Sequence, residues 1–560
     1  MDASAQTSPT LTPRHSVDGL ALKTASSVHE PSLDPRIALP DDPRAARLTS
    51  VQDAELGSVK SDVGKCEEAI YLEFEPNDPR DPVCWPNSKK WVVTALACFS
   101  TLMAASSATA FTMGTASMTV KFPQRLKNRG LTDRHQRDLN CTEFQATVAF
   151  IVFPLGFSLV PLVSSSFSEE VGRQPIYIAS AIGFTILYLP IALAKNIQTV
   201  TIARFLQGGF GSSWATMVGG TIADIWRPHE RGLPMAIFSL ASLGGTGLAP
   251  VVYGWVEMNS RLEWRWIEWI QMIYCGVYTV IVLLVMRETR SSILLVRLAQ
   301  KVRKETGDHR YRARIEDEKI KLSTLIYISC TRPIHLLFTE PVVSSFSLWI
   351  GFLWGVMFCM IESIPGEFSN LHNFNIGQEG TVFLTLVIGA SLGFLTNFYQ
   401  EHLYRKYYSR RGPEARLICA CAAAVVLPLA MFIYAWCSFP RIPWISLAIA
   451  VTLYIWATFM VYLAVFSYLA DCYGPFASSA LAGQSLCRNL LGTVFPLFTK
   501  HMFAVLGYTW ANTMFALIAT VMVPIPFVLF FYGPRIRARS RFSSIVMEQE
   551  RLAAMEHEKV

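Results

Sequence analysis

The stretch that decides the fold runs from Arg204-Phe205-Leu206-Gln207-Gly208 through a polar turn at 224–232 to Gly254. On both sides of the turn the chain is apolar over the length of a membrane span. Arg204, Gln207 and Gly208 are spaced i, i+3 and i+4, so they share one helix face. An arginine at membrane depth costs about 2.5–3.5 kcal/mol on insertion scales, so it normally faces a protein interior or a water-filled path. The stretch therefore predicts a membrane helix that lines a polar path; the alternative is that Arg204 snorkels to an interface or pins a neighbouring helix.

The composition of the whole chain is that of a protein with many membrane spans. Of its 560 residues, 52% are hydrophobic and 16% are charged, and the mean hydropathy is +0.33. Soluble domains typically carry about 25% charged residues. The basic residues behind the net charge of +7 gather in loops. The sequence has no basic stripe with interleaved aromatic residues, so a nucleic-acid partner is not expected. The twelve cysteines include no C-x₂-C pair, so neither a metal site nor a disulfide framework is expected.

Twelve apolar segments predict an all-α membrane protein made of two six-helix bundles. Each segment is close in length to the ~20 residues that cross a bilayer. The segments are 91–113, 144–166, 175–194, 199–221, 234–255 and 267–286, then 342–363, 378–400, 415–437, 444–469, 477–503 and 509–532. We therefore expect five regions in chain order: a disordered cytosolic tail at 1–84, a bundle at 85–286, a cytosolic loop at 287–340, a bundle at 341–532 and a cytosolic tail at 533–560.

The distribution of Lys and Arg predicts the orientation in the membrane. Basic residues gather in 287–340, in 401–414 and at the end of the chain, so both termini and the central loop are expected on the cytoplasmic side. The loop at 121–140 is basic as well, although this orientation places it outside. The same loop holds the only Asn-x-Ser/Thr sequon, at Asn140, which is a glycosylation candidate very close to the next helix.

Three short motifs add residues that carry chemistry. The turn between the second and third helices holds Glu169, Gly172 and Arg173, in which the glycine supplies backbone freedom and the charges can latch neighbouring helix ends. The fourth helix carries the Arg204 motif and is followed by Asp224. The fifth helix carries small residues that let helices approach closely, together with a proline, at Gly245, Gly247, Pro250 and Gly254.

With these motifs the chain resembles a major facilitator superfamily transporter of the fungal drug:proton antiporter class with twelve helices, in its polyamine and multidrug exporter group. The resemblance covers about residues 75–541. The chain departs from the pattern at Ser165-Ser166, where Gly-Pro is usual, and in the fifth helix at Thr246 and Ala249. The resemblance implies export by alternating access, powered by inward proton movement and without a cofactor. It links Arg204 to proton coupling and assigns the fifth-helix Gly/Pro run to the interface between the halves.

Further polar residues inside the apolar segments are candidates for the transport path. Glu362 ends an aromatic stripe with Trp354 and Phe358 at i, i+4 and i+8; it either binds a cation or a proton, or lies in water at the outer rim. On the eleventh helix Arg488 and Asn489 are buried polar candidates, since an arginine is costly in lipid. Glu268 is expected at the outer membrane interface, between two tryptophans.

We therefore expect a proton-coupled exporter of a small amphipathic molecule such as a drug, a polyamine or a secondary metabolite. It is expected to be a monomer in the plasma membrane, in contact with lipid. A facilitator or importer of a small metabolite or organic acid, or a membrane sensor, is the alternative. An enzyme or an ATP-driven pump is not expected, because the chain has no H-x-x-x-D run and no G-x-x-x-x-G-K-[ST] loop.

Overall fold

The computed structural model describes residues 20–24, 69–75, 77–118, 139, 141–227, 230–259, 261–317, 322–540 and 542–548. The chain divides into two compact units. The larger unit consists of Pro86–Arg287 and Lys321–Val560 and holds the apolar helices. The smaller unit consists of Met1–Trp85 and Glu288–Ile320. The glycosylation candidate Asn140 lies outside the described residues.

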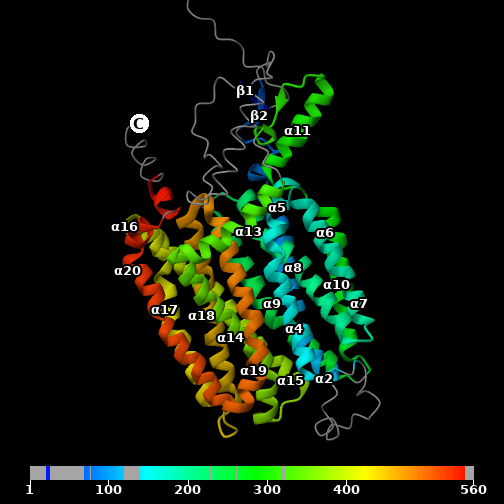
Figure 1. Cartoon of the computed structure of the whole chain (residues 1–560), viewed down its shortest axis with the longest axis vertical. Helices are drawn as coiled ribbons and strands as arrows, with labels where there is room; N and C mark the ends of the chain where they lie inside the picture. Colours follow the sequence, from blue (N-terminus) through cyan, green and yellow to red (C-terminus); the bar gives the residue numbers. More distant parts are fainter. Residues whose placement is uncertain are drawn as a thin grey trace, which may run out of the picture. The chain divides into compact units, whose positions relative to one another are not determined.

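The N-terminal half of the larger unit crosses the apolar layer six times (Figure 1). Two of these crossings are made of two consecutive helices each. The helices are α2 (Asn87–Met118), α4 (Glu143–Leu159) with α5 (Pro161–Glu170), α6 (Arg173–Ile186) with α7 (Tyr188–Ala192), α8 (Ile197–Ile225), α9 (Gly232–Met258) and α10 (Glu263–Val285).

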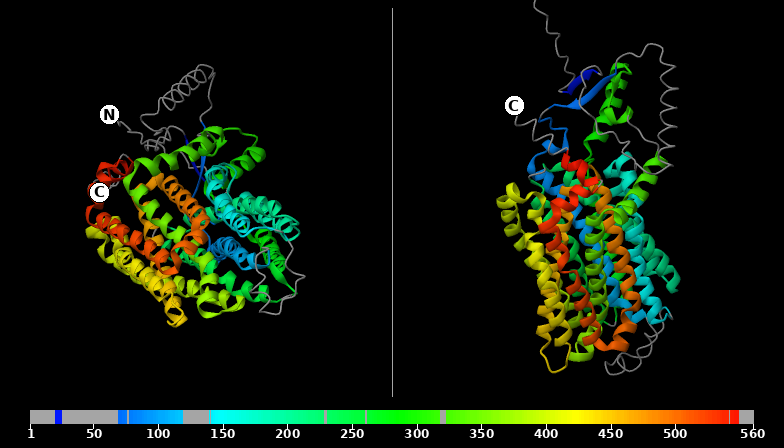
Figure 2. Two further views of the ribbon diagram at one scale, coloured as in Figure 1. Left: turned by 60° about the horizontal axis from the view of Figure 1, so that its bottom comes forward. Right: turned by 60° about the vertical axis from the view of Figure 1, so that its left-hand side comes forward.

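The C-terminal half repeats this arrangement after α13 (Leu322–Thr339), and Figure 2 shows its helices, coloured green to red, beside those of the first half. Gly507, with φ 72°, breaks α19 into two helices, and the second of these continues the crossing with α20. The helices are α14 (Pro341–His372), α15 (Ile376–Val382) with α16 (Leu384–Arg411), α17 (Ile418–Cys437), α18 (Trp444–Tyr473), α19 (Ala477–Met522) and α20 (Pro524–Arg539).

Length and hydropathy support twelve crossings. Among the described residues, nine stretches are long and apolar enough to span a membrane. Two of them, Ile376–Cys437 and Ala477–Arg539, hold two crossings each, which brings the total to eleven. The twelfth is α8, whose arginine, glutamine and glycines lower its hydropathy. The predicted fold of two six-helix bundles is confirmed.

Three turns that carry arginines lie at one end of the bundle. The α5–α6, α8–α9 and α16–α17 turns share the end that is uppermost in Figure 1. Because Arg173, Arg231 and Arg416 lie at these turns, we call it the basic end, and we call the opposite end the far end. Gly172 (φ 101°) and Gly412 (φ 62°) form two of the turns, since only glycine adopts such angles without strain.

The smaller unit is a short sheet with a helix packed on it, made of segments from the regions 1–84 and 287–340. Leu20–Thr24 (β1) pairs antiparallel with Ile70–Phe74 (β2), which pairs in parallel with Tyr311–Arg312 (β3). Helix α11 (Ser291–Thr306) packs against this sheet, and the short helix α12 (Arg314–Asp317) follows β3. The core of the unit is apolar and consists of Leu72, Ala299, Val302 and Ala313. The sequence does not predict this sheet, because its strands are short and far apart in the chain.

Candidate functional site

Arg204 is the centre of a polar cluster inside the N-terminal half. Its side chain is 0% exposed, so it does not snorkel to the membrane interface. Its Nη1 donates to the backbone oxygen of Ser107 on α2 (3.0 Å) and to Gln207 Oε1 (3.3 Å). Its guanidinium lies over the rings of Phe111 and Phe153, at 4.5 and 4.7 Å from their centroids. These cation–π contacts offset part of the cost of burying the charge.

Glu268 belongs to the same cluster. It is 1% exposed and interacts electrostatically with Arg204, so the expectation that it lies at the outer interface is wrong. Helix α10 begins at Glu263, and its second turn points this carboxyl group into the half rather than toward water. Nε and Nη2 of Arg204, Nε2 of Gln207 and Oε2 of Glu268 have no hydrogen-bond partner within the described structure. Buried polar atoms normally have partners, so these four atoms make the cluster around Arg204 a candidate site.

Close backbone contact holds Arg204 in place. Gly208 is packed so tightly that a Cβ atom there would lie 2.1 Å from the carbonyl oxygen of Phe153 on α4. A Cβ atom on Gly156 of α4 would likewise lie 2.2 Å from the carbonyl oxygen of Phe205. The spacing of Arg204, Gln207 and Gly208 therefore does two things: the arginine and glutamine meet in the cluster, and the glycine brings α8 against α4.

A second group of charges joins the two halves near the far end. Thr147 on α4 donates to Glu362 Oε1 on α14 (2.8 Å) and accepts from Lys500 Nζ on α19 (3.1 Å). Lys500 and Glu362 form an ion pair at 3.4 Å. The carboxyl side chain of Glu362 is 9% exposed, so it is not in bulk water at a rim. The N-terminal half contributes a hydroxyl group to an ion pair made by the C-terminal half.

Arg488 is the centre of a third cluster, inside the C-terminal half. Its guanidinium lies over the rings of Trp354 on α14 (4.9 Å) and Tyr462 on α18 (5.3 Å). Nη2 donates to Ser485 Oγ at 3.3 Å, and Asn489 Nδ2 donates to the same oxygen at 3.4 Å. Arg488 and Asn489 are 8% and 5% exposed. The two predicted residues are therefore adjacent in one buried polar cluster.

Each half carries an arginine–aspartate clamp at the basic end. Arg173, at the start of α6, forms a salt bridge with Asp224, at the end of α8. Arg416, just before α17, forms one with Asp471 on α18 (3.0 Å) and is 3.3 Å from Glu401. The backbone at Glu169 is helical, and the structure does not describe its side chain.

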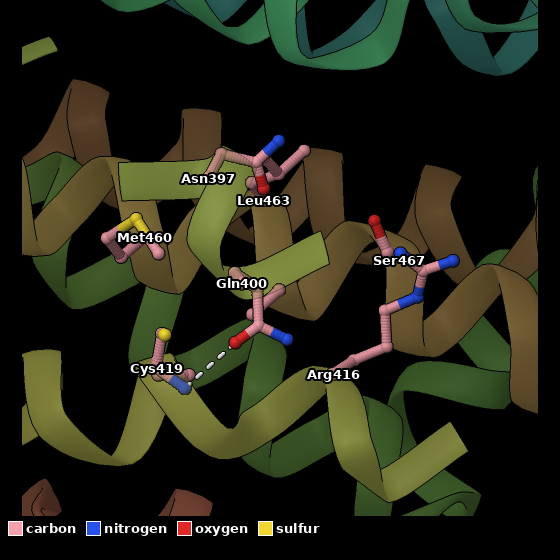
Figure 3. Close-up of a pocket in the computed structure, with 9 residues that line it drawn as sticks. Asn397, Gln400, Arg416, Cys419, Met460, Leu463 and Ser467 are labelled. Atoms are coloured by element: carbon pink, nitrogen blue, oxygen red, sulfur yellow. Dashed lines mark hydrogen bonds between the residues drawn. The ribbon is translucent and has the colours of Figure 1, made fainter. Parts of the chain in front are cut away.

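The C-terminal clamp borders a small pocket, shown in Figure 3. Gln400 lies in it, donates to the carbonyl oxygen of Ala415 and accepts from the backbone N–H of Cys419, both at 3.0 Å. Both ends of the Gln400 amide are therefore bonded to the turn that leads into α17. The pocket is walled by Asn397, Gln400, Arg416, Cys419, Ala420, Met460, Leu463, Ala464 and Ser467.

The glycines of α9 lie at helix contacts on two sides. A Cβ atom on Gly245 would lie 2.9 Å from the carbonyl oxygen of Leu102 on α2, within the N-terminal half. A Cβ atom on Gly247 would lie 2.7 Å from the carbonyl oxygen of Phe383, and Gly254 meets Gly380, both residues of the C-terminal half. The carbonyl oxygen of Pro250 also faces Gly380. This run therefore packs α9 against α15 and α16 across the interface between the halves.

The sequence predictions named some members of each group and missed others. Ser107, Thr147 and Lys500 were not predicted, because a serine, a threonine and a lysine near a helix end are common in membrane helices. The pairing of Arg416 with Asp471 was not predicted either. The signal that could have found this pair is the match with Arg173 and Asp224, which occupy the same places in the first half.

Comparison with known proteins gives a consistent result. The family model of the Major Facilitator Superfamily matches residues 90–474. The citrinin biosynthesis cluster MFS transporter mrr1 of Monascus ruber is 32% identical over 85% of this chain and 93% of its own length. The major facilitator superfamily multidrug transporter mdrA of Aspergillus fumigatus is 31% identical over 85% of this chain and 76% of its own length. Efflux pump atB of Aspergillus terreus is 33% identical over 71% of this chain and 85% of its own length.

Among solved structures, the chain resembles the xylose transporter XylE from E. coli in a partially occluded inward open conformation. The TM-score is 0.54 at 13% identity, and the match covers 79% of this chain and 99% of that one. At this identity the likeness concerns the fold alone.

Proposed function

The chain belongs to the major facilitator superfamily, and we propose that it exports a small amphipathic molecule in exchange for protons by alternating access. Relatives described as a multidrug transporter, as efflux pumps and as transporters of biosynthetic clusters support the direction of transport. They also support drugs and secondary metabolites as the class of substrate. The basic end faces the cytoplasm in this proposal, because Lys and Arg concentrate on that side of membrane proteins. The membrane is the plasma membrane, and a monomer carries out transport.

The observation that carries the proposal is the contact of Thr147, Glu362 and Lys500 between the halves. Alternating access requires the contacts near one end to break while those near the other form. Near the far end, this group is accompanied by Trp255 on α9, whose Nε1 donates to Thr381 Oγ1 on α15 (3.1 Å).

A proton is a suitable trigger for that contact. Protonation of Glu362 removes the charge that attracts Lys500, so the ion pair loses its Coulomb energy while the carboxyl group stays in place. The hydrogen bonds that depend on the carboxylate then weaken between the halves. Proton release to the cytoplasm leaves Glu362 ionised beside Lys500 and so stabilises the closed far end, which is the state in which an exporter takes up its substrate from the cytoplasm.

The Arg204 cluster supports proton coupling inside the N-terminal half. When a buried carboxyl group beside a buried arginine gains or loses a proton, the local charge balance changes strongly. Glu268 and Arg204 are such a pair, and their unpartnered polar atoms are places where water can bind and pass a proton.

The test is an efflux assay in cells that express the wild type, Glu362→Gln or Glu367→Gln, with and without a protonophore. The loaded compounds are a polyamine, a lipophilic cationic drug, an organic acid and an amphipathic glycolipid. Glu362→Gln removes the charge opposite Lys500 and should lower efflux by about tenfold or more, the loss expected for a charged hydrogen bond. Glu367→Gln is the matched control, because Glu367 lies on the same helix but bonds to Tyr434 and Ser438 within the C-terminal half.

Export that the protonophore abolishes in the wild type, and that Glu362→Gln reduces more than Glu367→Gln, supports the proposal. Efflux that continues unchanged with the protonophore points instead to a facilitator. Equal losses in the two variants would show that the far-end contact has no special role.

A further inference from the structure

We propose that Arg488 binds an oxyanion of the transported molecule, so that the substrate is an aromatic or otherwise apolar carboxylate. This inference rests on the proposed function and narrows its substrate class. It also predicts that neutral and cationic analogues of the same size are poor substrates.

Arg488 lies deep in the bundle, on the side of its half that meets the other half. It is eleven residues after the start of α19 at Ala477, about 16 Å along the helix. The rings beside it belong to helices that reach the N-terminal half one turn further on. On α14, Phe358 packs against Phe150 of α4 (5.8 Å), and on α18, Phe466 packs against Phe238 of α9 (6.4 Å). The arginine is therefore bordered on two sides by contacts between the halves.

The guanidinium of Arg488 has a buried hydrogen-bonding edge that is only partly bonded. Its Nε–H has no partner within the described structure, and its Nη2 makes only the 3.3 Å bond to Ser485. These two N–H groups form the edge that matches the two oxygens of a carboxylate. A carboxylate in that position would take both N–H groups at once.

Among the described residues, Arg488 also has no counter-charge. No described Asp or Glu forms an ion pair with it, and the rings of Trp354 and Tyr462 offset the charge only in part. Burying an arginine without an anion is expensive. An anion supplied by the substrate removes this cost, so the site gains most from a negatively charged ligand.

The groups around Arg488 are donors rather than carboxylates. Gln484, one turn earlier on α19, has an Nε2 without a partner in the part of the chain that the structure describes, and Asn489 presents an amide beside it. Trp354 and Tyr462, whose rings are 5.0 Å apart, form an aromatic wall that suits the apolar body of a ligand. This combination of donors and rings selects for an acidic, aromatic molecule.

The test measures binding to the purified full chain in lipid nanodiscs by calorimetry, without transport. The probes are naphthoate, its methyl ester and naphthylmethylammonium, which share one ring system and differ in charge. The wild type should prefer naphthoate to the ester, and Arg488→Gln should lose about tenfold to a hundredfold of the naphthoate affinity, as expected for charged hydrogen bonds. Binding of the ester should not change, which also shows that the variant is folded.

Two further variants keep the proposal falsifiable. Arg488→Lys retains the positive charge but not the two parallel N–H donors, so it should bind naphthoate with an affinity between those of the wild type and Arg488→Gln. Arg441→Gln removes an exposed cation from the loop between α17 and α18 and should leave naphthoate binding as in the wild type. Equal naphthoate affinity in Arg488→Gln and the wild type, or a preference for naphthylmethylammonium, overturns the inference.

The inference and the proposed function fail separately. If naphthoate binding depends on Arg488 but the protonophore does not change export, the proposal of proton coupling is wrong and the proposed anion site is supported. If export is proton-coupled but Arg488→Gln exports naphthoate and the ester as the wild type does, the anion site is wrong and the exporter stands.

Discussion

Each half of the bundle buries one arginine between two aromatic rings, but the surroundings of the two arginines differ. Arg204 is fully buried and interacts with an acid of its own half, Glu268. Arg488 is slightly exposed and forms no ion pair with any described Asp or Glu. The difference suggests a division of labour, because an arginine with an internal acid suits proton exchange and an arginine without one suits an external anion.

The clamps at the basic end are alike in position and different in number of partners. In both halves the arginine lies where the third crossing begins, and the aspartate lies near the end of the fourth. The C-terminal arginine, Arg416, adds Glu401 at 3.3 Å and the ring of Tyr404 at 3.7 Å from its centroid. The repeated position fits a two-fold repeated transporter, in which both clamps act on the same kind of helix movement.

The largest effect is expected from exchanging the two buried arginines for lysine. Arg204→Lys should reduce proton-coupled efflux of every substrate by about tenfold or more, because lysine cannot keep the bonds to Ser107 and Gln207 together. Arg488→Lys should lower efflux of anionic substrates and leave the protonophore sensitivity intact. Efflux of the substrate panel, with and without protonophore, measures the substrate preference and the protonophore sensitivity of each variant. Equal results in the two variants would show that the two arginines do not have separate roles.

A second effect concerns the close contacts between the second and fourth crossings of each half. A Cβ atom on Gly156 of α4 would lie 2.2 Å from the backbone oxygen of Phe205, whereas one on Gly393 of α16 would lie 2.6 Å from the ring of Phe459. The contact at Gly156 is shorter and is with a backbone carbonyl oxygen, which moves only with its helix, so Gly156→Ala should destabilise the protein by about 1–3 kcal/mol and Gly393→Ala by less. Thermal unfolding in detergent compares the two variants, and a larger loss for Gly393→Ala would contradict this reasoning.

The number of crossings and the position of Arg204 could be predicted because they depend on local sequence. Helix α8 is not among the stretches that hydropathy identifies as spans in the structure, yet the sequence predicted it as the apolar segment 199–221, and the spacing of Arg204, Gln207 and Gly208 placed these residues on one of its faces. The glycines of α9 were also predicted at an interface, since small residues in a membrane helix indicate close packing.

The parts that could not be predicted depend on distant partners. Glu268 stands among tryptophans, a pattern typical of a membrane interface, and only Arg204 on another helix explains its burial. Glu362 stands out in the sequence for its own charge, but its partners Thr147 and Lys500 come from two other helices. The strand pairing of Ile70 with Tyr311 has the same cause, because nothing in either short segment specifies the other.

The smallest effect is expected at the C-terminal clamp. Asp471→Asn leaves Arg416 with Glu401 and the Tyr404 ring, so efflux should change by less than about twofold, as for a partly exposed ion pair. Combining Asp471→Asn with Glu401→Gln removes both carboxylates and should change efflux by more than the product of the single effects, because the two acids substitute for each other. Asp224→Asn, at the N-terminal clamp, provides the comparison in the same assay. If Asp471→Asn alone matched Asp224→Asn and the double variant added nothing, Glu401 would be no substitute, and the two clamps would be equivalent.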